Sequence, residues 1–286
     1  MVVLPPLRRL RLPPRAVRMP LVMGIVNVTP DSFSDGGKFL DPHAAIRHGR
    51  YLVEQGADWI DVGGESTRPG STRITAEEEL RRVMPVIRGL ARAVHVPIAI
   101  DTSKADVASA ALQAGASIVN DITALHGDPA MARVIARARA RVILMHMRGT
   151  PQTMQRHPRY HDVVEDVSSF LSEAATRAMA SGIARARIFL DPGLGFGKTV
   201  THNLQLLRGL PRLASLGFPM IIGPSRKSFI GKMLDADLHA RVPGTLACIA
   251  WAQRAGVAAV RVHDVRETVD CLRMLQAIET VKTRTP

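Results

Sequence analysis

Short apolar runs alternate with longer segments of helical period from about residue 21 to the end of the chain. The runs show little alternation between apolar and polar positions. This is the pattern of strands that are buried on both faces of a parallel sheet. We predict eight strands: Leu21–Val26, Trp59–Val62, Pro97–Ile100, Ser117–Val119, Val142–Met145, Arg187–Leu190, Pro219–Ile222 and Ala258–Val262.

The segments between these runs place apolar side chains on one face of a helix. We predict helices over residues 42–56, 104–114, 162–181, 243–256 and 264–282. The expected helix starts combine a capping side chain with a helix-compatible first turn, at Asp41-Pro42, at Thr75 with Glu78 three residues later, and at Asp128-Pro129. Glycines predict the helix ends, at Gly56, Gly115, Gly182 and Gly256.

Eight strand–helix units that end on a helix predict an α/β fold, a single (β/α)₈ TIM barrel over residues 20–286. A doubly wound open sheet is the alternative. Its dinucleotide fingerprint is absent, because Gly193, Gly195 and Gly197 do not have the spacing GxGxxG. The stretch Gly197-Lys198-Thr199 imitates the end of a phosphate loop, but Pro192 occupies the position of the first glycine.

The composition is that of a globular protein, with 46% hydrophobic and 22% charged residues in a chain of 286. It excludes disordered, collagen-like and coiled-coil chains. No stretch approaches the roughly 18–20 apolar residues of a membrane-spanning helix, so we expect no membrane partner. The two cysteines, Cys248 and Cys271, lie in predicted helices. We expect reduced, buried thiols and a cytoplasmic protein.

The net charge of +13 has a local component at the N-terminus. The first 20 residues contain five arginines and no acid, at positions 8, 9, 11, 15 and 18. Prolines interrupt this segment and it has no apolar region of a secretory signal, so we interpret residues 1–19 as a frayed basic extension, with a presequence as the alternative. Aromatic residues are 4% and no basic stripe occurs elsewhere, so we expect no nucleic-acid partner.

Polar side chains follow the predicted strands, whose carboxyl ends meet on one rim of a barrel. The acids and amides are Asp61, Asp101, Asn120 and Asp191, and the basic residues are Arg68, Lys227, Arg261 and His263. The acidic set suits a planar group rich in donors, and the positive set, with helix N-termini, suits a phosphate-like anion. For a single residue such as Asp61 or Asp121, capping of the next helix is an equal alternative.

Other groups are weaker candidates. Phe33 and Phe196 suit flat contacts with a ring or ordinary packing. We expect no zinc, because His146, His157 and His161 have no histidine or cysteine partner at metal spacing.

Eight motifs in order resemble the dihydropteroate synthase family of pterin-binding enzymes and span about residues 20–280. They are the runs 23–37 (MGIVNVTPDSFSDGG), 61–70 (DVGGESTRPG), 101–104 (DTSK), 120–122 (NDI), 144–147 (LMHM), 191–198 (DPGLGFGK), 225–228 (SRKS) and 261–264 (RVHD). Any one of them alone is weak, whereas the ordered set is specific. Arg73 is a departure from the family pattern.

The resemblance implies a reaction of folate synthesis in a homodimeric barrel, with Mg²⁺ as the cofactor. In it, 6-hydroxymethyl-7,8-dihydropterin diphosphate and 4-aminobenzoate give 7,8-dihydropteroate and diphosphate. The family is the target of sulfonamides, which mimic the aminobenzoate. The implied partners of this chain are therefore small-molecule substrates and a second copy of itself.

The resemblance also implies a role for each site residue. The pterin would contact Asp101, Asn120, Met145, Asp191, Phe196, Gly223 and Lys227. The aminobenzoate would contact Phe33, Thr67, Arg68, Pro69 and Ser225, and the diphosphate Asn27, Arg68, Arg261 and His263, with Mg²⁺ on Asn27. The implied catalytic residues are Arg68, Asp101, Lys227, Arg261 and His263.

We expect a dissociative, SN1-like displacement. An aryl amine is neutral at pH 7 and needs no general base, so the difficult step is departure of the diphosphate. Asp101 and Asp191 would stabilise the cation that remains, while the loops after the first two strands exclude water. A methyltetrahydrofolate methyltransferase-like barrel and a pterin-binding paralogue without catalysis are the alternatives.

Overall fold

The computed structural model describes residues 19–29, 41–68 and 70–281. Within these ranges eight parallel strands form one sheet in the order β6-β5-β4-β3-β2-β1-β8-β7. The strands are β1 (Leu21–Asn27), β2 (Trp59–Gly63), β3 (Ile98–Asp101), β4 (Ile118–Asp121), β5 (Arg141–Met145), β6 (Ile188–Asp191), β7 (Ile221–Ile222) and β8 (Ala259–Val262). A parallel bridge from Leu190 to Met220 brings β6 beside β7, so the sheet curls into a nearly closed barrel. The predicted TIM barrel is confirmed.

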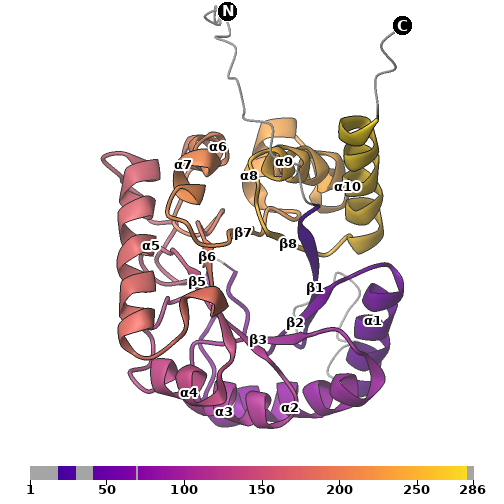
Figure 1. The fold of residues 1–286 in the computed structure, drawn as a ribbon, viewed down its shortest axis with the longest axis vertical. Coiled ribbons are helices and arrows are strands. Elements are labelled where there is room, and N and C mark those ends of the chain that lie inside the picture. The colour runs from indigo at the N-terminus through magenta and orange to yellow at the C-terminus, as the bar shows by residue number, and fades with distance from the viewer. Residues whose placement is uncertain (1–18, 30–40, 69, 282–286) are drawn as a thin grey trace, which may run out of the picture.

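Helices surround the strands (Figure 1). They are α1 (Pro42–Glu54), α2 (Ala76–Ala93), α3 (Ala105–Gln113), α4 (Met131–Ala138), α5 (Val163–Ala180), α6 (Val200–Arg208), α7 (Leu210–Ala214), α8 (Ser228–Leu234), α9 (Val242–Arg254) and α10 (Val265–Thr280), with 3₁₀ turns η1 (Arg185–Arg187) and η2 (Leu238–Arg241). No helix in the described ranges is long and apolar enough to cross a membrane. The predicted boundary at residue 20 stays a prediction, because residues 1–18 lie outside these ranges.

Most predicted helix boundaries are confirmed by capping contacts. The Asp41 carboxylate accepts hydrogen bonds from the first turn of α1, and the Thr75 hydroxyl accepts one from Glu78 N. The four predicted terminal glycines all have positive φ, between 75° and 115°. The left-handed conformation costs a glycine little and lets the chain turn back toward the next strand.

Several predicted boundaries differ from the structure by one to three residues. β7 begins at Ile221 rather than at Pro219. α4 begins at Met131, after a turn in which the Asp128 carboxylate accepts from Ala130 N at 2.9 Å, and the second oxygen of Asp128 accepts from Ala105 N at 2.9 Å at the start of α3. β6 begins at Ile188, because Arg187 N donates to Ala184 O in a 3₁₀ turn.

One apolar side chain from each strand fills the barrel interior. These residues are Met23, Trp59, Ala99, Ile118, Ile143, Phe189, Ile221 and Ala259. The rings of Trp59 and Phe189 meet edge to face at 5.2 Å between centroids. A second, larger cluster packs the outer face of the sheet against the helices. The eight interior side chains form an apolar plug. This plug fills the barrel below its carboxyl end, so any ligand at that end lies on top of it.

The cysteine prediction needs a correction. Cys248 in α9 and Cys271 in α10 are free thiols in helices, as expected, but both are only partly buried. Cys248 packs against the cluster between helices and sheet, and solvent reaches part of each thiol side chain. Burial still raises the pKa of both thiols, that of Cys248 to about 11, so both are protonated at neutral pH.

Candidate active site

The predicted site residues occupy one layer directly above the apolar plug. Successive side chains in a strand alternate between two faces, so a residue two positions after a plug residue also faces the barrel interior. The register of neighbouring strands then places these positions side by side, with Asp101 opposite both Gly63 and Asn120. The layer comprises Asp61, Asp101, Asn120, Met145, Asp191, Gly223 and Arg261, with Asn27 at the end of β1.

Arg261 links the acids on one side of this layer. Its Nε donates to Asp61 Oδ2 at 2.5 Å, and its Nη2 donates to Asp101 Oδ2 at 2.9 Å. Asn120 Nδ2 donates to the same Asp61 oxygen at 3.1 Å. Asp61 is fully buried, and its Oδ1 has no hydrogen-bond partner in the described part of the chain. Asp61 therefore fixes Arg261 and Asn120 rather than capping the next helix.

Asp191, at the end of β6, belongs to the same layer, and Lys227 follows β7. Asp191 Oδ1 accepts from Gly193 N at 2.7 Å, which leaves its second carboxylate oxygen available to a ligand. The Lys227 ammonium donates to Leu194 O and lies 4.7 Å from the centroid of the Phe196 ring. A cation over an aromatic face is attracted to it, so Phe196 helps to place the lysine.

Burial shifts the ionisation of this layer. It raises the pKa of Asp101 to about 8 against the opposing charge of Arg261, and it raises the pKa of Asp191 against that of Lys227. Burial also lowers the pKa of Lys227 to about 8, although Asp191 opposes the shift. Desolvated carboxylates of this kind are stabilised by a ligand that donates several hydrogen bonds.

His263 differs from its predicted role as a cation. Burial, followed by the charge of Arg261, lowers its pKa to about 3, so the ring is neutral near pH 7. Its Nδ1 lies 3.0 Å from Ser225 Oγ, and its backbone N–H donates to the same oxygen at 3.1 Å. The hydroxyl can therefore donate to Nδ1, which leaves Nε2–H as a donor for an anion.

Among the described residues, the remaining predicted site residues have no side-chain hydrogen bond to the charged residues of this layer. Thr67 is half-buried and Arg68 is exposed, in loop 2 (residues 64–75). Met145 is buried on β5, and Gly223 lies beside Arg261, where a Cβ would be 3.6 Å from Arg261 Cβ, an ordinary van der Waals contact. Phe33 and Pro69 lie outside the described residues.

Asn27 is the predicted metal ligand. The described residues contain no group of three histidine, cysteine or acidic side chains that could hold a metal ion. Asn27 Oδ1 lies beside Gly63, 3.8 Å from the position of a Cβ there. One amide oxygen suits Mg²⁺, which keeps several waters and takes further ligands from substrate phosphates. The residues present therefore fit a metal that arrives with a diphosphate.

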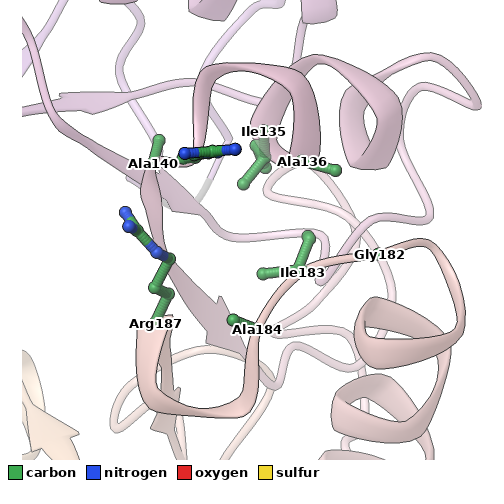
Figure 2. A pocket seen from close by; sticks show the side chains of 8 residues that line it. Ile135, Ala136, Ala140, Gly182, Ile183, Ala184 and Arg187 are labelled. Atoms are coloured by element: carbon green, nitrogen blue, oxygen red, sulfur yellow. The ribbon is translucent and has the colours of Figure 1, made fainter.

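Two cavities lie at opposite ends of the barrel. The larger, about 620 Å³, is lined by residues that follow the carboxyl ends of the strands, including Glu65, Ser103 and Thr123, together with Arg73. Figure 2 shows the smaller, about 360 Å³, whose lining includes Ala140 and Arg187, just before β5 and β6. The larger cavity thus shares its end of the barrel with the charged layer, and the smaller one does not.

A family model described as "Pterin binding enzyme" matches residues 23–263. The dihydropteroate synthase of Synechocystis sp. is 47% identical over 258 residues, which cover 90% of this chain and 89% of that relative. The chain belongs to the dihydropteroate synthase family. The family and the function that the eight motifs predict are thereby confirmed.

Solved structures of dihydropteroate synthases have the same architecture. The Yersinia pestis enzyme in a sulfonamide drug complex superposes with a TM-score of 0.89 and 43% identity, covering 93% of this chain and 96% of that chain. The Xanthomonas albilineans enzyme in complex with 7,8-dihydropteroate superposes with a TM-score of 0.84 and 44% identity, with the same coverage. These matches run over nearly the whole barrel.

Sequence reasoning missed several buried polar groups of this dihydropteroate synthase barrel. Lys104 bridges Glu65 of loop 2 and Glu79, which is fully buried in α2. Lys198 and His146 form a second buried pair, with Lys198 Nζ 2.9 Å from His146 Nδ1. All of these residues except Glu79 lie inside the eight motifs. Their positions in the sequence do not indicate which side chain each one contacts.

Proposed function

We propose that this chain condenses 6-hydroxymethyl-7,8-dihydropterin diphosphate with 4-aminobenzoate and releases diphosphate. The observation that carries the proposal is the buried layer in which Arg261 joins Asp61 to Asp101, with Asp191 and Lys227 facing it. Acids that accept hydrogen bonds and cations that attract an anion stand together at the catalytic end of the barrel. A similar enzyme was solved with 7,8-dihydropteroate, which joins the two substrate moieties.

The acids would bind the pterin by its pyrimidine edge. Asp191 would accept from the 2-amino group and N3–H, and Asp101 and Asn120 would meet the remaining ring nitrogens. Lys227 would donate to the carbonyl or N5 side, and Met145 would pack on a ring face. Gly223, which lies beside Arg261, and Phe196, whose ring lies under the Lys227 ammonium, would complete the pocket.

The diphosphate would face Arg261, the Nε2–H of His263 and, from loop 2, Arg68. Asn27 would hold Mg²⁺ with the phosphate oxygens, and the bound metal would offset negative charge on the leaving group. Arg261 is already held by two acids, so it is oriented before the substrate arrives. Thr67, Arg68 and Ser225, with Phe33 and Pro69, would form the aminobenzoate site.

The reaction would proceed by departure of the diphosphate before the amine attacks. As the C–O bond breaks, positive charge develops on the pterin methylene carbon and its ring, and ionised Asp101 and Asp191 stabilise it. Arg261 and His263 stabilise the departing diphosphate. The neutral arylamine then forms the new C–N bond and loses a proton to solvent, so no general base of the chain is required.

We further propose that the protein is a cytoplasmic homodimer. Apolar side chains on α9 and α10 are exposed in the single chain, among them Trp251 at 50%, Met274 at 63% and Ile278 at 58%. A surface of this kind is stabilised when a second copy covers it. Sedimentation should give twice the mass of one chain, and Met274→Glu should shift the equilibrium toward monomers. A monomer at micromolar concentration contradicts the dimer.

A turnover assay tests the proposed reaction. Purified protein with both substrates and Mg²⁺ should form one diphosphate for each 7,8-dihydropteroate, and a chelator should slow the reaction. Pterin binding without product would instead identify a paralogue without catalysis. Methyl transfer from methyltetrahydrofolate would identify the methyltransferase-like alternative.

A further inference from the structure

Lys198 is buried behind the site and has no part in the reaction proposed above. It is 3% exposed and is the only buried lysine among those that the structure describes. Its Nζ lies 2.9 Å from His146 Nδ1, 2.9 Å from Phe196 O and 3.4 Å from His146 O. An ammonium has three donors, so these three acceptors use all of them.

The position of Lys198 is energetically costly. Burial lowers its pKa well below the usual value, and the charge of Asp191 opposes this shift. Burial also lowers the pKa of His146 to about 2, so this ring is neutral and its Nδ1 can accept from the lysine. No carboxylate hydrogen-bonds Lys198 in the described part of the chain. A buried amine with only neutral acceptors stabilises the fold poorly, which points to another role.

The three acceptors belong to two loops that lie directly against each other. Loop 5 (residues 146–162) follows β5, and loop 6 (residues 192–199) follows β6. A Cβ at Gly193 would overlap His146 O, and one at Gly197 would lie 2.6 Å from Arg148 O. Both glycines have positive φ, 65° and 64°. The two backbones therefore approach as closely as glycine allows, and Lys198 ties them together.

Loop 6 places the pterin-facing groups. Gly193 N fixes one oxygen of Asp191, and Leu194 O accepts from Lys227. Phe196, whose carbonyl Lys198 holds, carries the ring under the Lys227 ammonium. A shift of loop 6 relative to loop 5 would therefore move three groups of the pterin site together.

We propose that Lys198, held by His146, is a positioning residue that locks loop 6 onto loop 5 and so sets Asp191, Phe196 and Lys227 for the pterin. The inference deepens the proposed function and rests on its assignment of the pterin site. Lys198 acts through these three residues and does not touch the substrate.

Lys198→Met tests the proposal, because methionine retains the apolar length and removes every donor. The matched control is Lys232→Met, at an exposed lysine of α8. Well below the melting temperature, Lys198→Met should raise the KM for pterin diphosphate at least tenfold and leave the KM for aminobenzoate within twofold. The control should match the wild type in both. An unchanged pterin KM, with or without a lower Tm, overturns the proposal.

Substitutions at His146 provide a second test that does not depend on the folding of Lys198→Met. Asparagine places an acceptor near the position of Nδ1, whereas leucine removes it. His146→Asn should restore most of the pterin affinity that His146→Leu loses. The double variant Lys198→Met with His146→Leu should bind the pterin no more weakly than Lys198→Met alone. Equal losses in the two His146 variants, or additive losses in the double variant, contradict the lock.

Calorimetric titration with 7,8-dihydropteroate separates this inference from the proposed reaction. A wild-type protein that binds the ligand but has no turnover contradicts the proposed function. The ratio of dissociation constants between the wild type and each variant still tests the lock, and a ratio near one in Lys198→Met contradicts it.

Discussion

Replacing Asp101 by asparagine removes one negative charge from the site with little change of shape. Asp101 is 9% exposed, and its Oδ2 lies 2.9 Å from Arg261 Nη2. In the variant, Arg261 keeps its bond to Asp61, so the guanidinium stays in place. The pterin keeps a hydrogen-bonding partner at this position, because an amide oxygen still accepts. The substitution therefore isolates the charge of Asp101.

The charge should matter most in the transition state. Two unit charges about 5 Å apart interact by about 3 kcal/mol at an effective dielectric constant of about 20. A half-developed cation would therefore lose about 1.6 kcal/mol of stabilisation in Asp101→Asn, which corresponds to about a 15-fold lower kcat. The bound pterin is neutral in the ground state, so its dissociation constant should change by less than about threefold.

The pH dependence of kcat/KM provides a second test of the charge on Asp101. With its pKa raised to about 8 by burial, Asp101 of the free enzyme binds a proton below that pH and carries its charge above it. Wild-type kcat/KM for the pterin diphosphate should therefore rise as the pH approaches about 8 from below, and this ascending limb should be absent from Asp101→Asn. Stopped-flow turnover and equilibrium pterin binding, both from pH 6 to 9.5, provide the two quantities. Weaker pterin binding with an unchanged kcat would refute the role of Asp101 in stabilising the cation.

Three further predictions concern Lys227, Lys104 and Gly193. Lys227→Arg should remove the fall of kcat/KM above about pH 8, because Lys227 loses its proton there and a guanidinium does not. If the fall persists in the variant, it is caused by another group. Lys104→Met should lower the free energy of unfolding in urea melts by about 3 kcal/mol at pH 8, where it leaves a buried charge on Glu79. The loss should be smaller at pH 5, because burial raises the pKa of Glu79 and the unpaired carboxylate then binds a proton. Equal losses at the two pH values contradict the pairing. Gly193→Ala should lower Tm much further than Gly256→Ala. Both glycines have positive φ, but only an alanine at position 193 would overlap another atom, His146 O. Similar melting curves for the two variants contradict the close approach of the two backbones.

The fold and the layer of site residues could be predicted because they depend on local pattern. The apolar runs and their glycine-terminated helices define the barrel. Asp101, Asn120 and Asp191 each stand two positions after a plug residue, so the alternation of a strand carries them into the interior. A polar residue at such a position is unusual in a buried strand. That contrast is visible in the sequence alone.

The charge states and the partners of buried groups could not be predicted in the same way. Asp61 meets Arg261 across 200 residues of chain, and Lys198 meets His146 across 52. The sequence predicts a positive charge on His263, whereas burial beside Arg261 keeps its ring neutral. Each property depends on which side chains converge in three dimensions, and the spacing of motifs does not contain that information.

A crystal structure of the protein with the pterin diphosphate or 7,8-dihydropteroate would show whether the buried acids bind the pterin. We expect the pterin edge within about 3.2 Å of Asp191, Asp101 and Asn120, with the diphosphate or its position facing Arg261 and His263. A pterin bound in the cavity before β5 and β6 (Figure 2), or one that meets none of these acids, would contradict it.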